Sequence, residues 1–358
     1  MLGNATGLKT IFRSLRYPNY RLFFGGQSIS LIGTWIQRIA MPWLVYDLTK
    51  SVLLLGIVGF VGQVPTFLLS PYAGVLTDRW NRYRIMMITQ ILSMLQAGIL
   101  TVLIFAGSIE VWHILVLSGA LGCVNAFDVP ARQSFLFEMV NKKEDLGNAI
   151  ALNSSMMNGA RLLGPSIAGI LIAATGEGFC FLINALSYLF VIGSLMLMKV
   201  APKEIKPIQK SVFKEFKEGF SYTFGFVSIK YVMLLLALIS LMGMPYTVLM
   251  PVFAKEIFHG GPHTFGFLLG TSGLGAFMGA IYLASRKNIS GFEKIIPLAA
   301  GTFGTGLILF SFSRNFGFSL VLMVISGLFI LFQLAFSTAF LPTVFVYAQR
   351  LRVLCFYF

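Results

Sequence analysis

The sequence predicts an all-α membrane protein with about ten transmembrane helices. Of its 358 residues, 57% are hydrophobic and only 11% are charged, whereas a soluble domain carries roughly 25% charged residues. The apolar residues lie in long stretches, and one transmembrane helix needs about 20 of them. Lipid offers the backbone no hydrogen-bond partners, so such stretches cross it as helices, and the short alternating segments of barrel strands are absent.

The predicted spans are the long, evenly apolar stretches. They cover residues 22–46, 52–76, 85–106, 111–127, 147–174, 178–198, 231–254, 264–285, 295–313 and 316–347. The longest connection is polar and rich in lysine, and it separates six spans from about four. We therefore predict an N-terminal six-helix half at 1–200, a basic linker at 201–230 and an incomplete C-terminal half at 231–358.

The basic residues alternate between the two sides of the predicted membrane. Most lie in the N-terminal segment and in the connections after the second, fourth, sixth and eighth spans, whereas the opposite connections hold Lys50, Lys255 and Arg314. The positive-inside rule therefore predicts a multi-pass protein with a cytoplasmic N-terminus. Because this pattern explains the net charge of +14, we expect the lipid bilayer and a small-molecule substrate as partners, and no nucleic acid.

A short repeat relates the seventh span to the first. A Met-Pro pair ending at Pro42 is followed five residues later by Asp47. A second Met-Pro pair, ending at Pro251, is followed in the same register by Glu256. Together with the six-helix half, this repeat favours two related halves, which is a known plan of transporters.

The connection after the second span has a distinctive pattern, Gly74, any residue, Leu, a small residue, Asp78 and Arg79, and then Arg82 and Arg84. Glycine allows a neighbouring helix to approach closely, and an aspartate here suits a helix N-terminus or an arginine. The pattern and its place resemble the signature loop of the major facilitator superfamily. In the alternative interpretation, the arginines are plain positive-inside anchors.

This resemblance implies the major facilitator fold, two six-helix halves of which the second is incomplete here, and a loop that latches them in one state. In that family the loop aspartate meets a helix of the second half, and the arginine pairs with an acid at the inner end of the fourth helix. Asp128 stands at the matching place, so we expect it to complete the latch. The family usually has glycine where this chain has Asn81, and asparagine tolerates a left-handed backbone better than most residues.

The fifth span carries small residues around a proline. Gly159, Gly164, Pro165 and Gly169 form a pattern similar to the helix 5 motif of superfamily antiporters, in a shortened form. Small residues let helices pack tightly, and proline allows a bend. The resemblance favours export, and ordinary helix packing is the alternative.

Over about residues 12–340 the chain resembles one branch of the superfamily, the bacterial efflux proteins that include the enterobactin exporter and macrolide efflux pumps. The segments that carry this likeness are residues 17–21, 35–38, 43–46, 125–133, 148–153 and 161–165. The resemblance implies a secondary transporter of the bacterial inner membrane that exports drugs or siderophores by alternating access.

Two arginines fall inside predicted spans, Arg38 in the first and Arg161 near the middle of the fifth. A charge at this depth is costly, so such residues usually face a cavity and mark function. No acidic residue lies at that depth to neutralise them. We predict that they line a central cavity together with a set of polar neighbours and one methionine. The set is Gln37, Asn153, Met157 and Asn158. In the alternative interpretation, Arg161 bonds neighbouring carbonyls and fixes the fold.

Energy coupling has no obvious carrier in the sequence. We expect no cofactor or metal, and the proton-motive force is the candidate energy source. Proton coupling needs a group that titrates near the working pH, and only Asp47 and Asp128 are available as candidates.

The C-terminal residues, from about 349, do not resemble the family's basic loop and last two helices, which predicts a truncated chain. We expect a monomer. A non-transporting sensor or assembly partner is the second hypothesis. An enzyme is disfavoured, since no Ser-His-Asp, metal-binding or phosphate-binding pattern is present.

Overall fold

The computed structural model describes residues 12–140, 142–200, 227–285 and 292–344. Within these ranges every predicted span is helical and no strand occurs. The long helices are α2 (Pro18–Thr49), α3 (Val52–Arg79), α4 (Arg82–Phe105), α5 (Val111–Met139), α6 (Lys143–Thr175), α7 (Glu177–Leu197), α9 (Val227–Leu238), α10 (Pro245–Val252), α11 (Pro262–Ser285), α12 (Phe292–Phe312) and α13 (Phe316–Val344). A short 3₁₀ helix, η1 (Arg13–Arg16), precedes them. The predicted all-α membrane fold is confirmed.

The seventh span is a composite helix. Between α9 and α10 lies the π-helical turn η2 (Ile239–Gly243), and α10 continues into a second π-helical turn, η3 (Phe253–Ile257). In these turns the amide of residue i bonds the carbonyl of residue i−5, as in the 3.0 Å bond from Phe258 to Phe253. π-Helical turns occur mostly as single bulges, frequently at functional sites.

The seventh span begins at Val227, inside the predicted linker 201–230, and the linker's residues 201–226 lie outside the described ranges.

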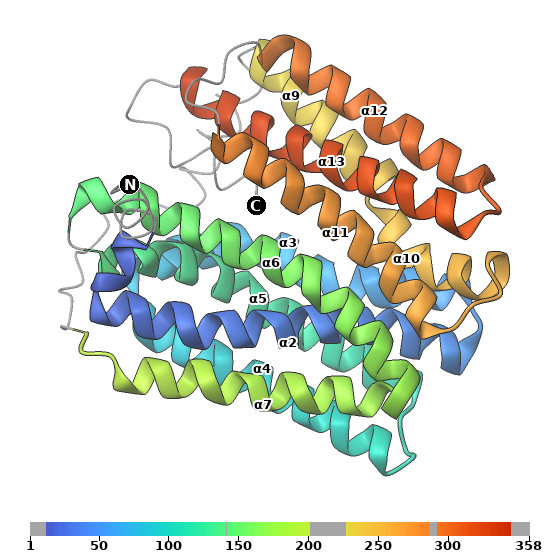
Figure 1. The fold of residues 1–358 in the computed structure, drawn as a ribbon. Coiled ribbons are helices and arrows are strands. Elements are labelled where there is room, and N and C mark those ends of the chain that lie inside the picture. Colours follow the sequence, from blue (N-terminus) through green and yellow to red (C-terminus); the bar gives the residue numbers. More distant parts are fainter. Residues whose placement is uncertain (1–11, 141, 201–226, 286–291, 345–358) are drawn as a thin grey trace, which may run out of the picture.

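The helices form two groups, α2–α7 and α9–α13 (Figure 1). In the first, α2 packs against α6 and α7, and α5 packs against α3 and α4; in the second, α13 packs against α11 and α12. The main contact between the groups is α6 against α11. The connection at 80–81 and the start of α6 lie on the same side as η1, which we call the basic side, and the connections at 50–51 and 258–261 lie on the opposite side (Figure 1).

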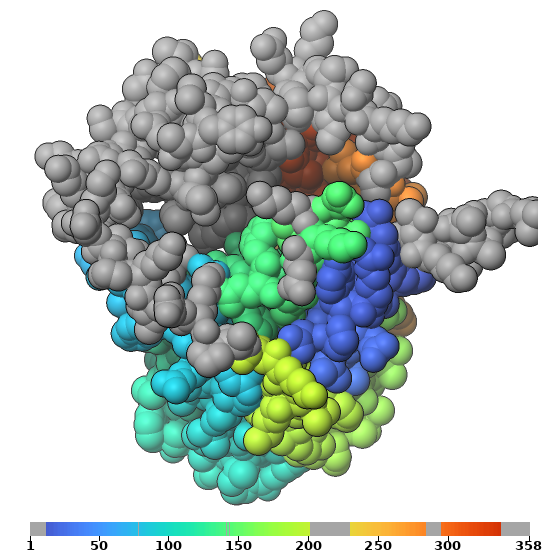
Figure 2. All heavy atoms as spheres, turned by 90° about the vertical axis from the view of Figure 1, so that its left-hand side faces the viewer, coloured from blue at the N-terminus to red at the C-terminus, as the bar shows by residue number. Residues whose placement is uncertain are grey.

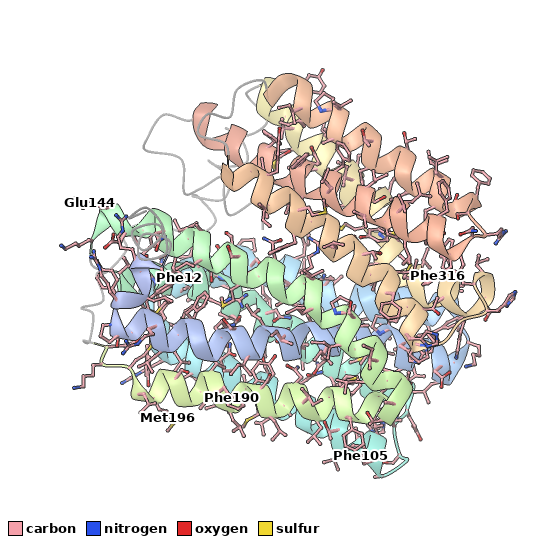
Figure 3. All side chains as sticks on the ribbon, viewed as in Figure 1. Phe12, Phe105, Glu144, Phe190, Met196 and Phe316 are labelled. Atoms are coloured by element: carbon pink, nitrogen blue, oxygen red, sulfur yellow. The ribbon has the colours of Figure 1, made fainter. Side chains whose placement is uncertain are left out.

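The surface of the bundle suits a lipid environment. Nine helices among the described residues are long and apolar enough to cross a membrane. The first span, α2, is not one of them, and it carries Arg38 and a row of buried polar side chains, including Gln27 and Ser30. On α7, Phe190 and Met196 point away from the bundle (Figure 3) and are 55% and 71% exposed. Such exposure of large apolar side chains is expected where lipid, rather than water, covers a helix.

The turn between α3 and α4 differs from the expectation for Asn81. Asn81 has φ −68° and ψ 109°, an extended conformation, so no left-handed backbone is needed at this position. Its side-chain oxygen accepts a 3.2 Å hydrogen bond from the Arg84 amide and so caps α4. The signature loop keeps its turn without glycine because asparagine acts here as a helix cap.

Candidate functional site

The candidate site is built around Trp35, midway along α2. The guanidinium carbon of Arg38 lies 5.2 Å from the centroid of the Trp35 ring, and that of Arg161, from α6, lies 6.0 Å away. Arg38 is exposed and Arg161 is half-buried. Close packing of α6 on α2 creates this arrangement, because a Cβ atom at Gly164 would collide with the Cβ atom of Trp35. The two arginines predicted from the sequence therefore share one aromatic ring.

The α6 residues predicted beside Arg161 are half-buried. Met157 packs with Trp35 in a small apolar cluster between α2 and α6. The amide nitrogen of Asn158 donates a 2.9 Å bond to the Ser154 carbonyl of its own helix. Asn153 lies on the same helix, two turns before Arg161. These residues stay candidates for the cavity wall.

Gln37 lies elsewhere than we expected. Its side chain is 5% exposed and bonds Gln96 of α4 at 3.0 Å and Asn184 of α7 at 2.7 Å. A helix turns about 100° per residue, so Gln37 and its neighbour Arg38 face different surroundings. Gln37 belongs to a polar network inside the first group of helices rather than to the surface around Trp35. No sequence pattern indicated Gln96 or Asn184 as its partners.

The helix 5 motif joins the two groups of helices. A Cβ atom at Gly169 would lie 2.9 Å from the Cα atom of Gly266 in α11, and one at Gly266 would lie 2.7 Å from the Pro165 carbonyl oxygen. By contrast, a Cβ atom at Gly159 would meet no heavy atom within 4 Å. Gly164 and Gly169 therefore set close approaches to α2 and α11, whereas Gly159 faces open space.

Enlarging Gly169 is expected to disrupt this junction. Gly169→Val should destabilise the protein by about 1–3 kcal/mol, since overpacking of this size forces neighbouring backbone apart, and should also lower transport. Thermal unfolding in detergent and export from cells would measure the two effects. Gly159→Ala is the matched control on the same helix, and it should leave both unchanged. Equal behaviour of the two variants would contradict the tight contact.

One arginine of the signature loop pairs with an acid that we did not predict. Arg82 pairs with Glu138 at 2.7 Å. Asp128 accepts bonds from Thr89 and Gln90, at 2.9 and 2.7 Å, and lies 3.8 Å from Arg132 of its own helix. We expected the fourth span to end at residue 127, but α5 continues to Met139, so Asp128 is an interior residue and Glu138 is the acid at the helix end.

The other members of the loop lie where α3 gives way to α4. Gly74, Asp78 and Arg79 are in the last turns of α3, and Arg84 is in the first turn of α4. The side chain of Asp78 is outside the described part of the structure. The expected contact of Asp78 with the second half therefore stays a prediction.

A second polar cluster, absent from the sequence prediction, holds η1 against α6. Asp145 is 1% exposed and pairs with Arg13 and Arg16, and it accepts a 2.6 Å bond from the Tyr17 hydroxyl. The bonds to Tyr17 and Asp145 raise the pKa of Arg16, which lies before the first span. The cluster is on the basic side, seen end-on in Figure 2, where α2 (blue) and α6 (green) lie together.

On the opposite side, the sequence repeat forms a reciprocal contact. The Tyr46 hydroxyl donates a 2.9 Å bond to Glu256, and Lys255 pairs with Asp47. Tyr46 and Lys255 each precede the acid of their repeat by one residue, so each repeat supplies one donor and one carboxylate. The Lys255 ammonium also lies 5.1 Å from the Trp43 ring centroid. We call these four residues, Tyr46, Asp47, Lys255 and Glu256, the reciprocal contact.

Comparisons with known proteins agree with this architecture. The model of the transmembrane secretion effector family matches residues 9–347. The staphyloferrin A transporter of Staphylococcus aureus is 27% identical, over 80% of this chain and 72% of the relative. Macrolide efflux protein A of Streptococcus pyogenes is 22% identical, over 82% of this chain and 73% of the relative. A bacterial homologue of the human lysosomal transporter Spinster, solved inward-facing and unoccupied, superposes with a TM-score of 0.69 at 12% identity, covering 95% of this chain and 78% of its own.

The chain is thus a major facilitator superfamily transporter rather than an enzyme. It belongs to the transmembrane secretion effector family. It is a secondary transporter that exports small molecules, and the relatives do not favour the hypothesis of a non-transporting sensor or assembly partner.

Proposed function

We propose that this protein exports a drug-type or siderophore-type molecule across the bacterial plasma membrane by alternating access, as a monomer with a cytoplasmic N-terminus. The names of the relatives support the substrate types, and the lysines and arginines gathered on the basic side support the orientation. The separation of the helices into two groups supports a division into halves at 1–200 and 231–358, with 201–230 as the linker.

The observation that carries this proposal is the pair of arginines around Trp35. Arg38 is exposed although it lies far from both ends of α2. In transporters with a central cavity, the substrate binds at such a depth. We assign the cavity wall to Arg38, Arg161 and the α6 residues Asn153, Met157 and Asn158. Pure interhelical packing, the alternative, suits Arg161 less well, because its guanidinium makes no hydrogen bond to a carbonyl among the described residues.

The arrangement of the groups supports an inward-facing state. The reciprocal contact joins them on the opposite side, which is the outer side in the proposed orientation. Toward the basic side the ribbons of α6 and α11 diverge (Figure 1). In the outward-facing state the reciprocal contact would separate, and the loop of Gly74, Asp78, Arg79, Arg82 and Arg84 would latch the basic side, with Glu138 in place of Asp128 as the partner of Arg82.

We propose the proton-motive force as the energy source. Lys255 and then Lys50 hold the pKa of Asp47, which lies beyond the predicted first span, below its ordinary value. A carboxyl whose pKa is lowered stays charged at neutral pH, so Asp47 is a poor proton carrier. Asp128, which is 7% exposed within the first group, remains the better candidate.

Export itself tests the function. The full chain would be expressed in bacteria that lack their own pumps, and accumulation of a macrolide and of a catecholate siderophore would be followed. We expect at least one to accumulate less, an Asp78→Asn variant to abolish the difference, and a protonophore to do the same. Unchanged accumulation of both compounds, with protein present in the membrane, would contradict the proposal.

A further inference from the structure

Two positively charged side chains lie beside the ring of Trp35. Among the described residues, neither Arg38 nor Arg161 takes part in an ion pair or a side-chain hydrogen bond. Both guanidinium carbons lie within 6.0 Å of one ring centroid, and they are therefore no more than about 11 Å apart. Contact with the ring face attracts a cation, but it leaves the net charge of the pair unneutralised.

This positive region is both deep and accessible. Arg161 lies roughly 27 Å from the start of α6 and roughly 21 Å from its end, by the helical rise. Nevertheless Arg38 is exposed, and Arg161 is only half-buried. Charges at this depth usually face a cavity or pair with one another, and these two have an accessible face that remains to be filled.

We propose that Arg38 and Arg161 together bind a small organic anion with at least two carboxylate groups, and that the exported substrate belongs to this class. Each carboxylate would accept hydrogen bonds from one guanidinium, whose planar fork matches a carboxylate. The two guanidinium carbons, no more than about 11 Å apart, are close enough for two acidic groups of one small molecule to reach both. The inference rests on the proposed export function and names the substrate class of that same site.

Binding to the purified full-length protein is the first test. Malonate, succinate, glutarate and citrate serve as probes, and triethyl citrate is the uncharged match for citrate. We expect at least one carboxylate to raise the midpoint of thermal unfolding, triethyl citrate to have no effect, and added KCl to weaken the response, since ion pairs at an exposed site are screened by salt. If no carboxylate binds, or if chloride alone produces the same shift, the inference is wrong.

Variants locate the site. Arg38→Gln and Arg161→Gln should each weaken carboxylate binding about tenfold, because each removes one charged hydrogen-bonding partner. Arg161→Lys should keep part of the affinity, which guards against simple misfolding. Arg314→Gln, at an exposed arginine in the connection between α12 and α13, is the matched control and should bind as the unmodified protein does. Unchanged affinity in folded Gln variants that are merely less stable would show a packing role and overturn the inference.

Export separates this inference from the proposed function. Cells loaded with carboxyfluorescein, an anionic dye, and cells loaded with ethidium, a cation, would be compared. We expect carboxyfluorescein to be exported, and Arg161→Gln to slow that export about tenfold. Export of ethidium or a macrolide, without export or binding of any anion, would support the proposed export function and contradict the inference about the substrate class. Binding of dicarboxylates without export of any compound would support the binding site and contradict the proposed export function.

Discussion

Lys255→Glu is expected to slow export by about tenfold or more, because like charges placed together at an interface cost several kcal/mol. The substitution would bring a new carboxylate beside Asp47 and Glu256, where the structure has an ion pair and a cation over Trp43. In the proposed cycle the reciprocal contact closes the outer side of the inward-facing state, so repulsion there would depopulate that state. The measurement is the initial rate of export from cells with matched amounts of protein in the membrane.

The reverse charge pair provides the control. Asp47→Lys together with Lys255→Glu restores opposite charges, and we expect it to recover most of the rate. Tyr46→Phe removes only the 2.9 Å bond to Glu256 and should have a smaller effect, about twofold, as for the net contribution of one hydrogen bond. If Lys255→Glu exports normally, or if the double variant is no better than the single one, the reciprocal contact has no role in the transport cycle.

Arg82→Glu should have the second large effect. Arg82 and Glu138 have side chains only 17% and 22% exposed, and they join the basic-side ends of α4 and α5. Two carboxylates at this place should cost about 2 kcal/mol or more, as for other partly desolvated charge pairs that lose one partner. We expect both the midpoint of thermal unfolding and the rate of export to fall.

Charge reversal again gives a sharp test. Arg82→Glu with Glu138→Arg should recover stability and at least part of the export rate. Asp128→Asn is the comparison, because the family pattern points to Asp128 and the structure points to Glu138. Recovery in the Arg82/Glu138 pair would identify Glu138 as the partner of the signature loop. A double variant as impaired as Arg82→Glu alone would contradict the assignment.

The sequence by itself determined the class of fold and the family. Apolar stretches of this length cross lipid as helices, so the ten spans follow from composition. The alternation of basic connections predicts their orientation. The signature loop from Gly74 to Arg84 and the small residues around Pro165 followed from short-range patterns. Arg38 and Arg161 could be selected from the sequence because a charged side chain inside a span is costly whichever face of the helix carries it.

Only the tertiary structure decided which side chains meet. Gln37 and Arg38 are neighbours in sequence, but the helical turn between them sends one into a network with Gln96 and Asn184 and leaves the other exposed. Because α5 extends to Met139, Glu138 rather than Asp128 is the acid near its end, and Glu138 pairs with Arg82. The pairing of the two repeats depends on contacts across about 210 residues. The helical period determines which residues share one face of a helix. The packing of the helices determines which residues of other helices that face contacts.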